Sequence, residues 1–153
     1  KTEAIASDIS TSALEVAKRN EYLLRYKYPK ESCLTFKQTD RLVGVEEMFH
    51  MILSNPPYIK EDGDRDKVHS QVESHEPHLA LYLKDDEYDQ WFHELFSQVD
   101  QHLYDGGLFF MEGHEDHLEY QSDILKEYNF KEVEVIKDYT GRDRFLKAIK
   151  TGK

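Results

Sequence analysis

The chain has 153 residues, of which 31 are acidic and 20 basic, and a formal net charge of −11. This length is typical of one domain with a real hydrophobic core, so we expect a single domain over residues 1–153. The negative charge repels phosphate backbones and anionic lipids, which argues against direct nucleic-acid binding and membrane binding. The single cysteine, Cys33, can form no internal disulfide, which suits a reducing cytoplasm, and we expect it to be a small core residue.

The first elements in chain order are a short strand and a helix. Residues 4–7 are small or apolar, which predicts a short buried strand that runs into Asp8. Ser10 or Ser12 can cap the helix that follows. Ser12 also has capping-box spacing to Glu15, which makes two starting points possible.

Two further strands and a polar segment come next. Residues 33–36 predict a strand that ends shortly before Asp40, and residues 48–53 predict one that ends at Asn55. Residues 60–78 are polar and mixed in charge, without apolar periodicity, so we expect a long loop. Loops of this length within compact domains are usually functional lids or disordered.

The second half begins with the clearest helix, in which apolar residues recur at three- and four-residue steps: Tyr88, Trp91, Phe92, Leu95, Phe96, Val99 and Leu103. We expect residues 105–107, which include two glycines, to end it. A buried strand over 108–111, a helix over 116–128, and a terminal pair of strands over 133–136 and 145–149 complete the chain.

This order predicts an α/β fold with a mostly parallel, doubly wound sheet and a terminal antiparallel strand pair. Ligands of such folds bind beyond the carboxyl ends of the parallel strands. Asp8, Asp40 and Asn55 all fall at predicted strand ends. We therefore expect a binding site there.

The segment Asn55-Pro56-Pro57-Tyr58 has few accessible conformations, because proline fixes its own φ and pushes the preceding residue toward extended geometry. The side-chain carbonyl of Asn55 and the main-chain carbonyl of Pro56 can act as two fixed acceptors for one NH2 group, with Tyr58 as an aromatic wall. Such a site suits a planar amide or an aromatic amine. The alternative is a Pro-Pro turn that only ends a strand.

An amide nitrogen is a poor nucleophile because its lone pair is delocalised. Two acceptors that favour a pyramidal nitrogen in the transition state would act by orientation and preorganised electrostatics. The reaction also needs a strong electrophile close by.

The stretch "SNPPYI" resembles the signature of S-adenosylmethionine-dependent methyltransferases that act on exocyclic or amide nitrogens. "SDISTSALEVAKRN", "HEPHLAL", "LYDGGLFFMEGH" and "DYTGRDRFLKAI" resemble, in order and spacing, segments of the protein-glutamine methyltransferases that modify peptide-chain release factors (HemK/PrmC type). The resemblance covers essentially the whole chain. It implies a Rossmann-like class I methyltransferase fold and methyl transfer to a release-factor glutamine.

The resemblance also implies a cofactor site for S-adenosylmethionine, which leaves as S-adenosylhomocysteine. Asp8 would accept hydrogen bonds from the ribose hydroxyls, or else only cap the following helix. Asp40 would accept from the adenine amine or simply end a strand. Arg41 stands where the family often has an aromatic residue beside the adenine, and its guanidinium could stack there. Asn55 would adjoin the cofactor.

The substrate site implied by the resemblance is the amide clamp of Asn55, Pro56, Pro57 and Tyr58, with these residues as the catalytic set. Glu76, in the polar segment, would lie where the family closes over its substrate, or would be a solvated side chain before a proline.

Two groups of residues remain outside this site. Arg142 and Arg144 could serve the release factor, but we favour a role in the terminal strand pair. The spacing of the histidines permits metal ligation, either by His69, His75 and His78 or by His114 and His117. We expect surface histidines and no metal site, because no cysteine partners or fixed scaffold accompany them.

The family carries a glycine-rich cofactor loop after its first strand, and this chain has no such sequence. We therefore expect residues 1–153 to be the C-terminal catalytic domain, truncated at its N-terminal side, without the first strand and weak or inactive alone. An adenine-specific nucleic-acid methyltransferase is the alternative within the same chemistry, although the charge opposes it. A non-catalytic methyltransferase-like interaction module is a further alternative.

Overall fold

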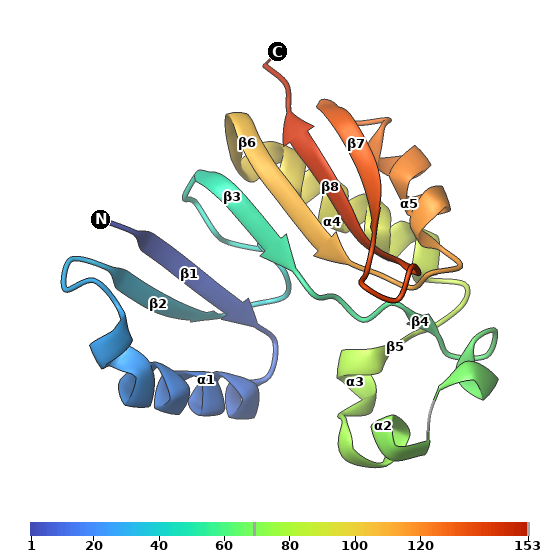
Figure 1. Ribbon diagram of the computed structural model, residues 1–153, viewed down its shortest axis with the longest axis horizontal. Coiled ribbons are helices and arrows are strands. Elements are labelled where there is room, and N and C mark those ends of the chain that lie inside the picture. The colour runs from blue at the N-terminus through green and yellow to red at the C-terminus, as the bar shows by residue number, and fades with distance from the viewer. Residues whose placement is uncertain (69, 153) are drawn as a thin grey trace. The chain divides into compact units, whose positions relative to one another are not determined.

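The computed structural model describes residues 1–68 and 70–152 (Figure 1). The chain forms two compact units, Lys1–Glu46 and Glu47–Lys153, and each is described by itself. The expectation of a single domain over residues 1–153 stays a prediction. Within the described residues, no helix is both long enough and apolar enough to cross a bilayer.

The first unit is a two-stranded parallel sheet with a helical connection. Strand β1 (Glu3–Asp8) pairs with β2 (Cys33–Gln38), and α1 (Thr11–Leu24) with the short 3-10 helix η1 (Arg25–Lys27) connects them. The register aligns the last residues of the two strands, Asp8 and Gln38. The predicted strand, helix and strand are therefore confirmed in their positions, but the expectation that the first strand is buried is wrong, because β1 contains no buried residue.

Helix α1 starts at the first of its two possible caps. Ser10 has extended backbone angles, and its hydroxyl accepts a hydrogen bond from the amide of Ala13 at 3.2 Å. Ser12 already lies within the helix, so the predicted capping box with Glu15 is wrong. The earlier serine caps the helix because its backbone is still extended and leaves its hydroxyl facing the first free amides.

Apolar side chains of the first unit are only partly covered. Leu14 is buried, whereas Val16 and Leu23 of the same helix are 60% and 57% exposed. Cys33 is exposed at the start of β2, where it lines an open hollow with Ala4 and Pro29. The expectation that Cys33 is a core residue is therefore wrong.

The second unit is built on a four-stranded sheet in the order β3-β6-β8-β7. Strand β3 (Phe49–Ser54) runs parallel to β6 (Leu103–Glu112). Strand β8 (Asp143–Lys150) runs antiparallel to both β6 and β7 (Phe130–Lys137), which confirms the predicted terminal pair.

Two helices, α4 (Tyr88–His102) and α5 (Leu118–Leu125), pack against this sheet (Figure 1). Their apolar faces and the facing strands form one core, because only these sides of the helices carry apolar residues at the helical period. The residues of this core that are less than 2% exposed are Tyr88, Phe92, Phe96, Val99, Leu103, Phe109, Met111, Leu118, Leu125, Leu146 and Ala148.

The end of α4 differs from the prediction. The helix ends at His102 and β6 begins at once, so residues 105–107 lie inside the strand rather than ending the helix. The strand register is irregular there, since Phe49 pairs with Leu103 but Met51 pairs with Leu108. A Cβ atom at Gly107 would lie 2.8 Å from the carbonyl oxygen of Tyr104, so the tight bend requires glycine.

The polar segment over 60–78 is not one long loop. It contains the 3-10 helix η2 (Arg65–Lys67), helix α2 (Ser70–His75) and the start of α3 (His78–Leu81). Two-residue strands flank these short helices. Strand β4 (Ile59–Lys60) pairs in parallel with β5 (Tyr82–Leu83), which brings the two ends of the segment together. Elements this short bury too few apolar residues to leave a periodic signal in the sequence.

The cap of α1 provides a test of the fold. We expect Ser10→Ala to lower the free energy of unfolding by about 1 kcal/mol, because an amide of the first turn loses its acceptor. Ser12→Ala should stay within about 0.5 kcal/mol of the parent chain, since alanine favours a helix interior. Urea denaturation followed by circular dichroism measures both free energies of unfolding. A larger decrease for Ser12→Ala than for Ser10→Ala would show that Ser12 caps the helix instead.

Candidate functional site

The segment from Asn55 to Tyr58 follows directly on β3, where that strand leaves the sheet. Asn55 is exposed, Pro56 is buried and Tyr58 is partly buried. Strand β4 begins at Ile59, so the connection between β3 and β4 has only four residues, and two of them are prolines. The expectation that Asn55 stands at a strand end is confirmed.

An open pocket of about 340 Å³ lies at this end of the sheet. Asn55, Ser54 and Glu112 supply its polar groups. Apolar side chains from three adjacent strands supply the rest of the lining, namely Leu53, Phe110, Met111 and Phe145. A mostly apolar hollow with a few convergent polar groups is typical of small-ligand and side-chain binding sites.

The phenol of Tyr58 is oriented by the end of β6. Its hydroxyl donates a hydrogen bond to Oε1 of Glu112 at 3.0 Å. Burial, together with the adjacent carboxylate of Glu112, raises the pKa of Tyr58. The hydroxyl thus keeps its proton at neutral pH and stays a donor, which holds the ring in one place.

The main chain of the same segment is anchored in the core by Tyr88. The Tyr88 hydroxyl donates to the carbonyl oxygen of Tyr58 at 3.1 Å and accepts from Nε2 of Gln121 at 3.0 Å. Tyr88 is 1% exposed and Gln121 is fully buried. Burial raises the pKa of Tyr88, so this hydroxyl also remains a donor.

Sequence reasoning did not identify Tyr88, Gln121 or Glu112 as part of the site. The sequence pattern places Tyr88 only on the apolar face of a helix, although a phenol in such a face needs a hydrogen-bond partner when it is buried. That requirement was the available signal, but it does not say which partner the hydroxyl finds.

The two terminal arginines make ion pairs within the chain. Arg144 lies 3.8 Å from Glu112 and 3.8 Å from Asp138, and Arg142 lies 3.4 Å from Glu115. These contacts agree with the structural role that we favoured for them. Arg144 additionally supports the carboxylate that holds Tyr58.

The expected cofactor residues Asp8, Asp40 and Arg41 lie in the first unit, whereas Asn55 belongs to the second. Asp8 is exposed at the end of β1, and its carboxylate accepts from the amide of Ser10 at 2.7 Å. Nη2 of Arg41 donates to the carboxylate of Asp40 at 2.8 Å. The amide of Thr39 donates to the carbonyl of Asp8 at 3.1 Å, which brings the two strand ends together.

Glu76 and two of the histidines lie on the surface of the polar segment. Glu76 is exposed between α2 and α3, directly before Pro77, and His75 and His78 are exposed as expected. His69 lies outside the described residues. The prediction of a surface position is wrong for His114 and His117, whose side chains are only 15% and 19% exposed.

Comparisons with solved structures identify the fold. A crystal structure of a methyltransferase from Pyrococcus furiosus covers 97% of this chain and 62% of its own, with a TM-score of 0.63 and 20% identity. The N-methyltransferase NodS from Bradyrhizobium japonicum WM9, in complex with S-adenosyl-l-homocysteine, covers 97% of this chain and 66% of its own, with a TM-score of 0.59 and 12% identity. The chain therefore has the α/β fold of class I methyltransferases, as expected.

Sequence comparisons are more specific. A release factor glutamine methyltransferase from Clostridium botulinum is 36% identical over 154 residues, which cover 97% of this chain and 52% of the relative. The resemblance to the release factor glutamine methyltransferases is confirmed. The chain spans about half the length of the curated relatives it matches. No protein-family model matches it.

The anchoring role of Tyr88 can be tested by removing its hydroxyl group. We expect Tyr88→Phe to lower the free energy of unfolding by about 1–3 kcal/mol, because it leaves buried partners without a hydrogen bond. Tyr120→Phe is the matched control, since Tyr120 is 49% exposed and its hydroxyl bonds Asp89 at the surface. We expect this control to stay within about 0.5 kcal/mol of the parent. Equal losses in denaturant titrations would contradict the anchoring role.

Proposed function

We propose that this chain is part of an enzyme that transfers a methyl group from S-adenosylmethionine to the side-chain amide nitrogen of a glutamine in a peptide-chain release factor. The observation that carries the proposal is the segment from Asn55 to Tyr58: Asn55 lines the pocket, and hydrogen bonds fix both the ring and the main-chain carbonyl of Tyr58. The sequence similarity to release factor glutamine methyltransferases supports the substrate.

In this proposal, the exposed Asn55 and the carbonyl of Pro56 accept the two N–H groups of the substrate amide. Pro56 and Pro57 keep these acceptors fixed, and the ring of Tyr58 packs against the planar amide. Acceptors that need no rearrangement during the reaction favour a pyramidal nitrogen in the transition state. The clamp therefore orients the amide lone pair toward the methyl group.

The bound cofactor supplies a methyl group on a positively charged sulfur. Asn55 and Pro56 would hold the amide nitrogen toward this methyl group, and the cofactor would keep the electron pair of the carbon–sulfur bond on sulfur as the leaving group. The nitrogen then releases one proton to water. No general base is required before the methyl group moves, so the absence of a histidine from the clamp is compatible with this chemistry.

The proposed cofactor residues are Asp8, Asp40, Arg41 and Asn55. A carboxylate accepts several hydrogen bonds, so the contact of Asp8 with Ser10 leaves capacity for the ribose hydroxyls. Nη2 of Arg41 is held by Asp40, and the Arg41 side chain is 11% exposed; a planar guanidinium is a group that can stack on an adenine ring. The exposed position of Asp8 and the helix that follows it fit this group.

We propose release factors as the partners, with Glu76 among the residues that meet them, and a cytoplasmic location. The exposed single cysteine suits a reducing compartment. The formal charge of −11 argues against adenine in nucleic acid as the acceptor, because that substrate carries a dense negative charge of its own. We further propose that residues 1–153 form a catalytic domain of the enzyme.

The proposed reaction is tested by mass spectrometry. Purified release factor and S-adenosylmethionine are incubated with the chain and with any longer form that its gene encodes, and the release-factor peptides are then searched for one added methyl group on a glutamine. We expect this product from the form that carries the complete cofactor site. Methylated adenine in a nucleic acid, with unmodified release factor, would overturn the substrate assignment.

The amide clamp is tested by Asn55→Ala in the active form. We expect the methylation rate to fall by about 100-fold or more, as for the loss of a preorganised hydrogen-bonding group at a reacting centre. Asn20→Ala is the matched control, because Asn20 is exposed on α1. A rate for Asn55→Ala within about twofold of this control would contradict the clamp.

A further inference from the structure

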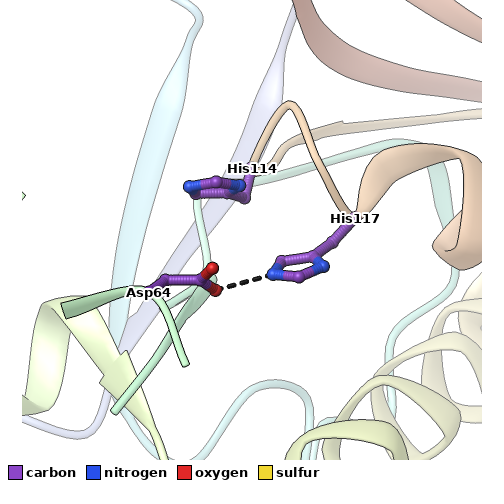
Figure 2. Close-up of side chains that lie close together, drawn as sticks. All are labelled: Asp64, His114 and His117. Carbon is purple, nitrogen blue, oxygen red and sulfur yellow. Dashed lines mark hydrogen bonds and ion pairs between the residues drawn. The ribbon is translucent and has the colours of Figure 1, made fainter. Parts of the chain in front are cut away.

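Three side chains outside the amide clamp converge at the end of β6. Asp64 precedes η2, while His114 and His117 lie on the turn between β6 and α5 (Figure 2). One ligand atom from each of the three residues lies within 4.8 Å of the others. The two histidine rings are 5.0 Å apart between centroids. Residues about 50 positions apart in sequence therefore present a carboxylate and two imidazoles to one point.

The carboxylate of Asp64 is buried, with a side chain only 4% exposed. Its Oδ2 lies 2.6 Å from Nε2 of His117 and accepts from the amide of Lys60 at 3.2 Å. Its Oδ1 lies 3.1 Å from Nζ of Lys67. These three contacts hold the buried carboxylate in one position.

The two histidines are positioned by the backbone of their turn. The amides of His117 and Leu118 both donate to the carbonyl of His114, at 3.0 and 3.1 Å. This places His117 at the start of α5 and holds its side chain beside that of His114. The side chain of His114 is only 15% exposed, so its ring is held between the turn and its neighbours rather than free in solvent.

We propose that Asp64, His114 and His117 bind one divalent transition-metal ion of the zinc class. Two imidazoles and one carboxylate are a common protein ligand set for zinc, with the fourth position left to water or another ligand. Mixed nitrogen and oxygen ligands select such ions over magnesium, which requires six oxygens in near-ideal octahedral geometry. The ion would take the place of the direct contact between Nε2 of His117 and Oδ2 of Asp64.

Lys67 opposes the ion in this site. Its ammonium lies between two carboxylates, 3.1 Å from Asp64 and 2.6 Å from Asp116. The Lys67 side chain is 52% exposed, so it can turn into solvent when a metal ion takes over the charge of Asp64. Lys67 thus acts as a competing cation, and its removal should strengthen metal binding.

A bound metal ion would cross-link the polar segment over residues 60–78 to the four-stranded sheet of the second unit. Asp64 belongs to the segment that begins at β4, directly after Tyr58, whereas the histidines follow Glu112 at the end of β6. The ring centroids of Tyr58 and His114 are 6.5 Å apart. A bound ion would therefore stiffen the segment that follows the amide clamp without touching the acceptor groups. This role does not depend on the proposed function.

Calorimetric titration with zinc chloride tests the site directly, with magnesium chloride as the negative control. We expect one zinc ion per chain and no magnesium binding. Cobalt should give the visible absorption of a four-coordinate site. His114→Ala and His117→Ala should each weaken zinc binding by about 100-fold, because each removes one of three ligands. His78→Ala is the matched control and should bind zinc like the parent, since His78 is an exposed histidine beside Glu61.

Lys67→Gln provides a test that does not depend on removing a ligand. We expect it to strengthen zinc binding by about fivefold, through loss of an exposed competing charge. Lys84→Gln is its control, because Lys84 makes a similar exposed ion pair with Glu87 and should leave the affinity unchanged. Unchanged zinc binding in both His114→Ala and Lys67→Gln would overturn the proposal, as would equal losses in His114→Ala and His78→Ala.

Discussion

The buried hydroxyl of Tyr88 is the constraint on which the candidate site depends. It joins the carbonyl of Tyr58 to the side chain of Gln121, and so ties the segment after β3 to helices α4 and α5. A phenol with 1% exposure cannot exchange these partners for water. The position of the Pro-Pro segment is therefore set by the core rather than by the surface, which is the arrangement expected of a preorganised binding site.

The same constraint explains why a short and polar sequence can form a precise site. Pro56 and Pro57 limit the local backbone, while Glu112, supported by Arg144, fixes the ring of Tyr58. What remains exposed is Asn55, at the edge of a largely apolar pocket. The geometry thus separates the groups that hold the site from the group proposed to contact the substrate amide.

Much of this architecture is predictable from the sequence because it depends on local patterns. The apolar period of α4 and the strand that ends before Asn55 both follow from residues close together in the chain. The contacts of Tyr88 and the meeting of Asp64 with His117 do not, since their partners lie about 30 and 50 positions away. The short helices between residues 60 and 78 are not predictable from the sequence either, because each is too short to show a periodic pattern of apolar residues.

Asn55 is the residue that we propose accepts the side-chain amide of the substrate glutamine. The most direct measurement follows the NMR resonances of the Asn55 side-chain amide while release factor is added in the presence of S-adenosylhomocysteine. We predict a saturable shift of these resonances with the release factor, and none with a version in which the methyl-accepting glutamine is replaced by glutamate. Equal shifts with both versions, or no shift while the two proteins bind, would contradict the claim.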